Sequence, residues 1–177
     1  MKLILGLGVT GLSVARFFIR NNISFRIADS RQDPTMLQIS KNENLLHDFY
    51  FGDWSESLLE DISEVIISPG IAESESIVRW IRAKNISIIS DIELFGRYVK
   101  APMIGITGSN GKSTVTQLLG EMALASSLKA YICGNIGNPV MECISDDAEL
   151  YIVELSSYQL DYTNKLDLFA GVITNIS

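Results

Sequence analysis

The chain has 177 residues, 47% of them hydrophobic and 20% charged, and its formal net charge is −7 with a pI near 4.7. This apolar fraction excludes a disordered linker, and no apolar run reaches the roughly 18 residues of a membrane helix. An acidic chain is also a poor candidate for a general nucleic-acid binder. We expect a globular protein of one or two domains, with no nucleic-acid partner and no membrane insertion.

Cysteine and histidine usage excludes several kinds of site. Cys133 and Cys143 do not make a disulfide framework, and their spacing is not a zinc signature. Nothing near the single histidine, His47, supports a metal site or a catalytic triad, so we interpret it as a surface or loop residue. The chain begins directly with an apolar strand and no signal peptide, so we expect it to be cytoplasmic.

Short β-branched runs alternate with helical stretches through the first half of the chain. We expect strands at 2–5, 24–28, 49–51, 65–67 and 86–89, and helices at 10–21 and 74–84. This alternation is typical of a parallel sheet covered by helices, a Rossmann-like α/β domain.

A second βα series follows a break at 97–102, because Pro102 cannot lie in a helix interior. We place the domain boundary between residues 98 and 99. The remaining residues are few for a mononucleotide-binding α/β domain, so we expect this second domain to be incomplete. Strands are expected at 103–106, 129–132, 150–154 and 170–173, and a helix from Lys112 whose apolar spacing is carried by Val115, Leu118, Leu119 and Met122.

The first glycine-rich segment joins the first expected strand to the first helix. Residues 6–11 read G-x-G-x-x-G, a turn whose backbone N–H groups can face a pyrophosphate. Asp29 ends the next strand, about where a dinucleotide-binding fold carries its acidic residue. NAD and UDP-sugars both contain a pyrophosphate, so the loop leaves the ligand open, and a purely structural turn is the alternative.

The second glycine-rich segment, residues 105–114, has the phosphate-cradling core of a P-loop. Lys112 is placed to reach terminal phosphates and the Ser113 hydroxyl to ligate Mg²⁺. Gly105 stands one place earlier than the first glycine of the strict pattern. Glu154 ends a hydrophobic strand and is the candidate second Mg²⁺ ligand. The alternatives are a glycine-rich turn with an incidental lysine and a solvated strand end.

Several segments in combination resemble the Mur ligase family. In the second half they are residues 105–114, which include that early glycine, with 134–137, 154–160 and 174–176. Within the family, residues 6–13, 29–31, 68–70 and 90–94 resemble the members that add D-glutamate. The resemblance covers essentially the whole chain.

The resemblance implies an ATP-dependent amide ligase of cytoplasmic peptidoglycan precursor synthesis. ATP phosphorylates the alanyl carboxylate of UDP-N-acetylmuramoyl-L-alanine, and the amine of D-glutamate attacks the acyl phosphate. Lys112 and Glu154 are the implied catalytic residues, and Ser113 and Glu154 the implied Mg²⁺ ligands. The implied ATP-binding residues are Gly108, Ser109, Asn110, Gly111, Lys112, Ser113 and Thr114.

The resemblance also implies a UDP-sugar site, with a diphosphate, a uracil and a muramoyl-alanine part. Its residues, in that order, are Val9, Thr10 and Gly70; Asp29, Ser30 and Arg31; and Asn135, Ser156 and Gln159. Asn135 is alternatively a turn residue, and Ser156 with Ser157 a cap after a strand.

The rest of the family's central domain and its D-glutamate-binding third domain are expected beyond Ser177, so the chain alone is expected to be inactive. Four other functions stay open. They are an NAD-dependent oxidoreductase, a P-loop kinase or NTPase with another substrate, a non-catalytic nucleotide-binding module, and a Mur ligase for another amino acid.

Overall fold

The computed structural model describes residues 1–45 and 48–176, so His47 lies outside the described residues. The chain divides into two compact units, Met1–Asp91 and Ile92–Ser177. This division falls before the boundary expected at 98/99, because helix α4 (Asp91–Gly96) packs within the second unit. There the ring of Phe95 meets that of Tyr151 edge-on, with 4.9 Å between centroids.

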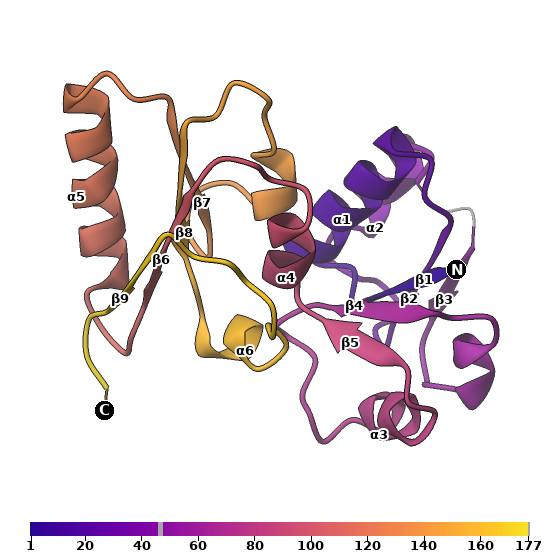
Figure 1. The fold of residues 1–177 in the computed structure, drawn as a ribbon. Coiled ribbons are helices and arrows are strands. Elements are labelled where there is room, and N and C mark those ends of the chain that lie inside the picture. Colours follow the sequence, from indigo (N-terminus) through magenta and orange to yellow (C-terminus); the bar gives the residue numbers. More distant parts are fainter. Residues whose placement is uncertain (46–47, 177) are drawn as a thin grey trace. The chain divides into compact units, whose positions relative to one another are not determined.

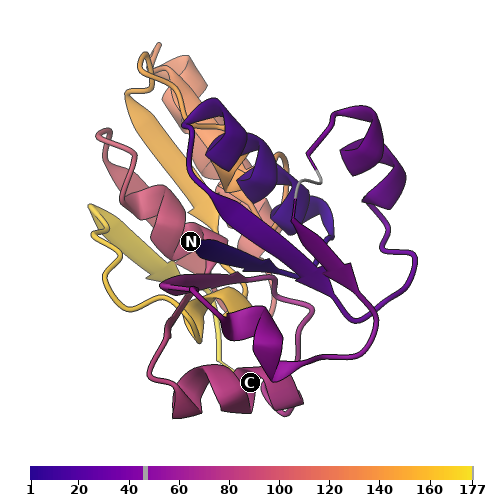
Figure 2. The ribbon, with the colours of Figure 1, turned by 90° about the vertical axis from the view of Figure 1, so that its right-hand side faces the viewer.

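The first unit is a five-stranded parallel sheet in the order β3-β2-β1-β4-β5. Helices α1 and α2 lie on one face of the sheet and α3 on the other (Figures 1 and 2). The strands are β1 (Lys2–Leu5), β2 (Phe25–Asp29), β3 (Phe49–Phe51), β4 (Glu64–Ile67) and β5 (Ser87–Ile89). The helices are α1 (Val9–Arg20), α2 (Leu37–Asn42), the short 3-10 helix η1 (Glu56–Leu59) and α3 (Ser76–Ala83).

The central strands of this unit explain why their sequences are continuous apolar runs. Leu3, Ile4 and Leu5 of β1 are fully buried, and Val65–Ile67 of β4 are at most 2% exposed. A parallel sheet covered on both faces has no polar face to alternate with, so the expectation of a helix-covered parallel sheet is confirmed. The chain order reverses between β1 and β4, where loops leave the sheet in opposite directions and open a crevice.

The second unit is a four-stranded parallel sheet in the order β7-β8-β6-β9. Helix α5 lies along one face of this sheet, and α4 and α6 lie on the other side (Figure 1). Ile106, Ile152 and Ala123 form a buried cluster between the sheet and α5, to which Ala123 belongs. The elements are β6 (Met103–Thr107), α5 (Lys112–Ala125), β7 (Ala130–Gly134), η2 (Val140–Glu142), β8 (Leu150–Glu154), α6 (Ser157–Leu160) and β9 (Ala170–Ile173).

Helix α5 begins at the expected residue, but only two of the four positions expected to face the core do so: Val115 and Leu119 pack against the buried cluster. Leu118 and Met122 are more than half exposed, while Thr116 and Ala123 are buried. The cause is Gly120: a Cβ at this position would lie 2.3 Å from Cδ1 of Ile132, so the helix leans closely onto β7. This rotation turns the flank that carries Leu118 and Met122 away from the sheet.

The fold contains three short helices that were not expected. The sequence patterns did not indicate α2, α4 or α6, which have six residues or fewer. Cys133 and Cys143 are both buried, and neither is part of a disulfide in the described part of the chain. Among the helices described, none is long and apolar enough to cross a membrane.

Candidate nucleotide-binding sites

The first glycine loop is a tight turn from β1 into α1. Gly6 has a φ of +97°, a left-handed conformation that favours glycine. A Cβ on Gly11 would lie 2.0 Å from the carbonyl oxygen of Gly6, so only glycine lets α1 pack this closely against the turn. A Cβ on Gly8 would have no atom within 4 Å, because this glycine faces open space. The three glycines therefore have separate roles in the turn, the helix packing and the cavity.

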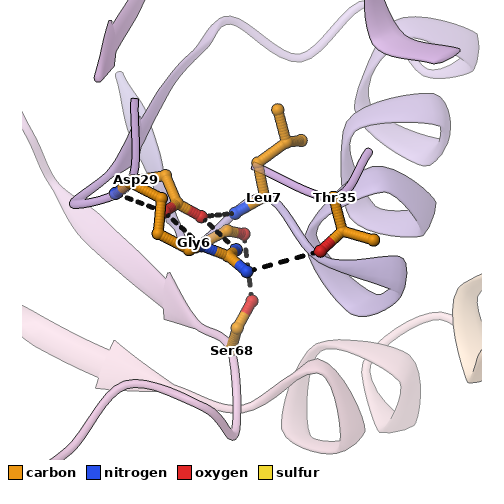
Figure 3. Close-up of polar contacts among 6 residues, drawn as sticks. Gly6, Leu7, Asp29, Thr35 and Ser68 are labelled. Atoms are coloured by element: carbon orange, nitrogen blue, oxygen red, sulfur yellow. Dashed lines mark hydrogen bonds and ion pairs between the residues drawn. The ribbon is translucent and has the colours of Figure 1, made fainter. Parts of the chain in front are cut away.

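Asp29, at the end of β2, fastens this turn to the neighbouring strand (Figure 3). Its Oδ2 accepts hydrogen bonds from the Leu7 amide at 2.7 Å and from Arg31 Nη2 at 2.6 Å. Its Oδ1 accepts from the Arg31 amide and from Arg31 Nε, both at 2.9 Å. All four acceptor positions of the carboxylate are thereby occupied.

The electrostatics of this pair follow from the same contacts. Burial alone raises the pKa of Asp29, but the hydrogen bonds from Arg31 and Leu7 outweigh burial and lower the pKa below its ordinary value. The same carboxylate raises the pKa of the Arg31 guanidinium. Arg31 Nη1 also reaches Thr35 Oγ1 at 3.4 Å, and Ser68 Oγ donates to the carbonyl of Gly6 at 3.0 Å (Figure 3). Asp29 is thus ionised and Arg31 is held in one direction.

These residues surround a cavity of about 430 Å³ at the carboxyl ends of β1, β2 and β4. Ligands of open α/β sheets bind at this point, where the strand order reverses. All six residues that the sequence assigns to the diphosphate and uracil line this one cavity. Its lining is Gly6, Gly8, Val9, Thr10, Asp29, Ser30, Arg31, Ser68, Pro69, Gly70 and Ile71.

The second glycine loop joins β6 to α5. Gly108 and Gly111 have φ values of +133° and +80°, so both need glycine's conformational freedom. The early glycine, Gly105, is a packing position, because a Cβ there would lie 2.8 Å from Cδ1 of Leu168. Lys112 Nζ donates to the carbonyl of Gly108 at 2.7 Å, which curls the lysine over the loop.

Glu154, at the end of β8, lies beneath this loop and is 1% exposed. Its Oε2 accepts from Ser113 Oγ at 2.9 Å, and its Oε1 accepts from Asn135 Nδ2 at 2.9 Å. The Asn135 amide also donates to the Glu154 carbonyl at 2.9 Å. The fold therefore brings together Ser113, Glu154 and Asn135, which are far apart in the sequence.

These residues fit a magnesium ion that takes some of its ligands from the protein and others from the phosphates of a nucleotide. The described residues hold no group of three or more His, Cys, Asp or Glu that could bind a metal by themselves. Mg²⁺, however, is usually held by one or two carboxylates together with substrate phosphates and water. A serine hydroxyl 2.9 Å from a buried carboxylate, beside a phosphate loop, has the donor chemistry that such an ion needs.

A second cavity, of about 670 Å³, opens beside this loop. Gln159 does not line it: its side chain is buried, and Oε1 accepts from the Ser156 amide at 3.1 Å, closing a capping box on α6. Ser156 both caps α6 and faces the cavity. The lining is Thr107, Gly108, Ser109, Lys112, Asn135, Ser156, Ser157, Tyr158, Ile173, Asn175 and Ile176.

Three residues at these cavities have contacts or positions that the sequence patterns did not indicate. Ser68 binds the Gly6 carbonyl, Tyr158 stands two-thirds exposed at the second cavity, and Asn175 contacts the phosphate loop. All three lie inside segments that resemble family motifs. Their place in those motifs was the only available signal, because neither charge nor periodicity marks them.

The fold and the two loops together define a class of protein. It is an α/β protein with two parallel-sheet units, and in each unit a glycine-rich turn joins the first strand to the first long helix. Residues 1–90 match the family described as "Mur ligase MurD-like, N-terminal domain", and residues 106–177 match "Mur ligase middle domain". The chain belongs to the Mur ligase family, whose members are ATP-dependent amide ligases.

Curated relatives named UDP-N-acetylmuramoylalanine–D-glutamate ligase match the whole chain. The one from Nitrosococcus oceani is 44% identical over 177 residues, and the one from Pseudomonas savastanoi is 40% identical over 176 residues. Each match covers 99% of this chain but 39% of the relative. The chain thus spans about two fifths of the length of these relatives.

Solved structures of two ligases align with the fold of this chain. A Neisseria meningitides UDP-N-acetylmuramate:L-alanyl-gamma-D-glutamyl-meso-diaminopimelate ligase aligns with a TM-score of 0.60 at 16% identity, over 99% of this chain and 60% of that one. The UDP-N-acetylmuramate-alanine ligase MurC from Thermotoga maritima aligns with a TM-score of 0.55 at 15% identity, over 99% and 41%. At these identities the likeness supports the α/β fold alone.

Proposed function

We propose that this chain carries the UDP-sugar and ATP sites of a ligase that adds D-glutamate to UDP-N-acetylmuramoyl-L-alanine through an acyl phosphate. The observation that carries the proposal is the joint placement of Lys112, Ser113 and Glu154 at one phosphate loop, in a chain about 40% identical throughout to ligases of that name. The reaction belongs to the cytoplasm, as the resemblance implies.

The contacts of Asp29 favour the UDP part of a UDP-sugar over NAD as the ligand of the first cavity. An acidic residue that binds the ribose hydroxyls of NAD needs free carboxylate oxygens, but four hydrogen bonds already occupy those of Asp29. We infer that Asp29 acts on uracil through Arg31, whose direction it sets. Gly8 and Gly70 line the cavity with open space at the Cβ position, which leaves room for a diphosphate to approach the backbone.

The second site supplies what phosphoryl transfer requires. Lys112 would exchange its bond to the Gly108 carbonyl for the terminal phosphates of ATP and offset their negative charge. Ser113 and Glu154 would hold Mg²⁺, which when bound supplies further positive charge at the phosphates. Asn135 holds Glu154 in place through Oε1. Phosphorylation converts the poor acyl donor, a carboxylate, into one with a phosphate leaving group.

Calorimetric titration of the 177-residue chain tests the assignment of the first site. We expect UDP and the UDP-sugar to bind and NAD not to bind. Thr10→Ala should lower the affinity for UDP modestly, because one neutral hydrogen bond contributes about 0.5–1.5 kcal/mol. Binding of NAD without UDP would replace this proposal by an oxidoreductase. Binding of MgADP without UDP would favour another P-loop enzyme or a nucleotide-binding module.

A chimera tests the catalytic part of the proposal. Residues 1–177 replace the matched segment of the Nitrosococcus oceani ligase, and D-glutamate-dependent phosphate release and product mass are followed. We expect activity, and at least about a tenfold loss in Lys112→Ala, the factor for about 1.4 kcal/mol of lost charge stabilisation. Normal turnover of that variant would show that the ATP site is misplaced. We expect the 177-residue chain alone to form no amide product.

A further inference from the structure

The segment that follows β9 contacts the phosphate loop through three hydrogen bonds. The Asn110 amide donates to Oδ1 of Asn175 at 2.8 Å, and the Ser109 amide donates to the Asn175 carbonyl at 3.1 Å. Thr174 Oγ1 donates to the Asn110 carbonyl at 2.6 Å. Two residues that follow one strand thus hold consecutive peptide groups of a loop that follows the neighbouring strand, β6.

The fit between the two segments is close. A Cβ on Gly108 would lie 2.2 Å from Thr174 Oγ1 and 2.9 Å from the Asn175 carbonyl oxygen. Thr174 is itself anchored, because its amide donates to the Thr107 carbonyl at 2.9 Å and so continues the β6–β9 ladder. The sheet therefore fixes the position from which Thr174 and Asn175 reach the loop.

These contacts select which loop donors face a nucleotide. The amides of Ser109 and Asn110 are engaged by Asn175. The first amide to bond back along α5 is that of Val115, to Gly111 at 3.1 Å. The amides of residues 111–114 precede it, and a helix leaves such N–H groups without intrahelical partners. Among residues 109–114, the amides left for a ligand are therefore those beside Lys112.

We propose that Asn175, supported by Thr174, is a positioning residue that sets the phosphate loop in its nucleotide-binding form before the nucleotide arrives. The inference rests on the proposed function of the second site. It assigns the Ser109 and Asn110 amides to loop positioning and leaves phosphate contact to the amides of residues 111–114 and to Lys112. A preorganised loop binds more tightly because less ordering is left to occur on binding.

The first measurement does not depend on nucleotide. Amide exchange of the ¹⁵N-labelled 177-residue chain is followed by NMR in Asn175→Ala and Asn175→Asp. The control is Asn164→Ala, the same change at an exposed asparagine outside both cavity linings. We expect the Asn110 amide to exchange about tenfold faster in Asn175→Ala, as a lost hydrogen bond near the upper end of its usual contribution would give. Asn175→Asp keeps an acceptor oxygen and should restore slow exchange, and Asn164→Ala should match the wild type. An unchanged rate in Asn175→Ala would overturn the proposal.

The second measurement uses fluorescent MgADP and UDP as probes. We expect Asn175→Ala to weaken MgADP roughly three- to tenfold and to leave UDP binding unchanged, since a loop freed to move adopts the binding form less often. Faster exchange with unchanged MgADP affinity would refute the positioning role. If Asn175→Ala fails to fold, Thr174→Val replaces it, because it removes the Oγ1 hydrogen bond at nearly constant shape. We then expect the same two results, faster exchange of the Asn110 amide and weaker MgADP binding. A wild-type chain that ignores MgADP would instead refute the proposed function, while the exchange result would still decide whether Asn175 holds the loop.

Discussion

At the residue scale, Asp29 links the strand β2, the glycine turn and the guanidinium of Arg31. Its pKa is lowered in the folded chain, because the hydrogen bonds to the carboxylate outweigh the burial that opposes them. A lowered folded pKa contributes stability that is fully present above the unfolded value, 3.8, and is lost as pH falls through the folded value. Arg31 is about half exposed, so solvent weakens the ion pair itself.

We expect Asp29→Asn to destabilise the first unit at pH 7 by about 1.5–3 kcal/mol, the range for hydrogen bonds to a charged group. The variant should also weaken UDP binding, because Arg31 loses its fixed direction. Denaturant unfolding from pH 7 down to pH 2 should show a shallower decline than in the wild type, since one acid-sensitive group is gone. Asp33→Asn, at an exposed site nearby, is the control. Parallel pH curves for wild type and Asp29→Asn would contradict this account.

Gly8 and Gly11 give a matched pair, because both belong to the same loop. Gly8→Ala adds a methyl group where nothing lies within 4 Å, so we expect normal stability and at least tenfold weaker UDP binding, roughly the effect of 1.4 kcal/mol. Gly11→Ala places its methyl 2.0 Å from the Gly6 carbonyl, so we expect about 1–3 kcal/mol of destabilisation from overpacking. Thermal melts and calorimetry separate the two effects. A Gly8→Ala chain that binds UDP normally would place the diphosphate elsewhere.

At the element scale, most of the fold could be predicted. Apolar runs of four or five residues, separated by helical spacing and glycine turns, indicated strands within a residue or two of those found. The family resemblance implied the six first-cavity residues. They line one cavity because β1, β2 and β4 are parallel, so their carboxyl ends meet at one edge.

The rest depends on side-chain geometry that spacing does not encode. The α5 face turned because of one glycine against Ile132, and the Gln159 side chain folded back onto its own helix. The linker helix α4 is too short to show periodicity. It joined the second unit through Phe95 and through Glu93, whose Oε2 accepts from the amides of residues 164 and 165 at 2.8 Å. Such tertiary contacts override local pattern.

The packing of α5 can be tested with two adjacent leucines. Leu119 packs against the buried cluster of the second unit, whereas Leu118 is 55% exposed. We expect Leu119→Ala to lower the free energy of unfolding by roughly 1–3 kcal/mol, as for a largely buried side chain, and Leu118→Ala to change it by less than about 0.5 kcal/mol. Denaturant titration followed by circular dichroism measures both. Equal losses would mean that α5 buries the face expected from its spacing.

At the scale of the whole molecule, the net charge of −7 opposes anionic ligands such as UDP and ATP. Binding therefore has to come from local donors: the turn and Arg31 in the first unit, and the α5 amino terminus and Lys112 in the second. The sets lie in different compact units, each at the carboxyl ends of its own parallel strands. The two ligands should then leave different footprints on the backbone.

We expect hydrogen exchange, read by mass spectrometry on the 177-residue chain, to resolve these footprints. UDP should slow exchange in peptides that contain residues 6–10, 29–31 and 68–71, because the ligand occupies the first cavity and steadies the loops around it. MgADP should slow exchange at residues 107–115. Arg31→Ala should remove the first footprint and Lys112→Ala should weaken the second, each without altering the other. A MgADP footprint on the loop at 6–10 would contradict the assignment, since that cavity would then be the one that takes the adenine nucleotide.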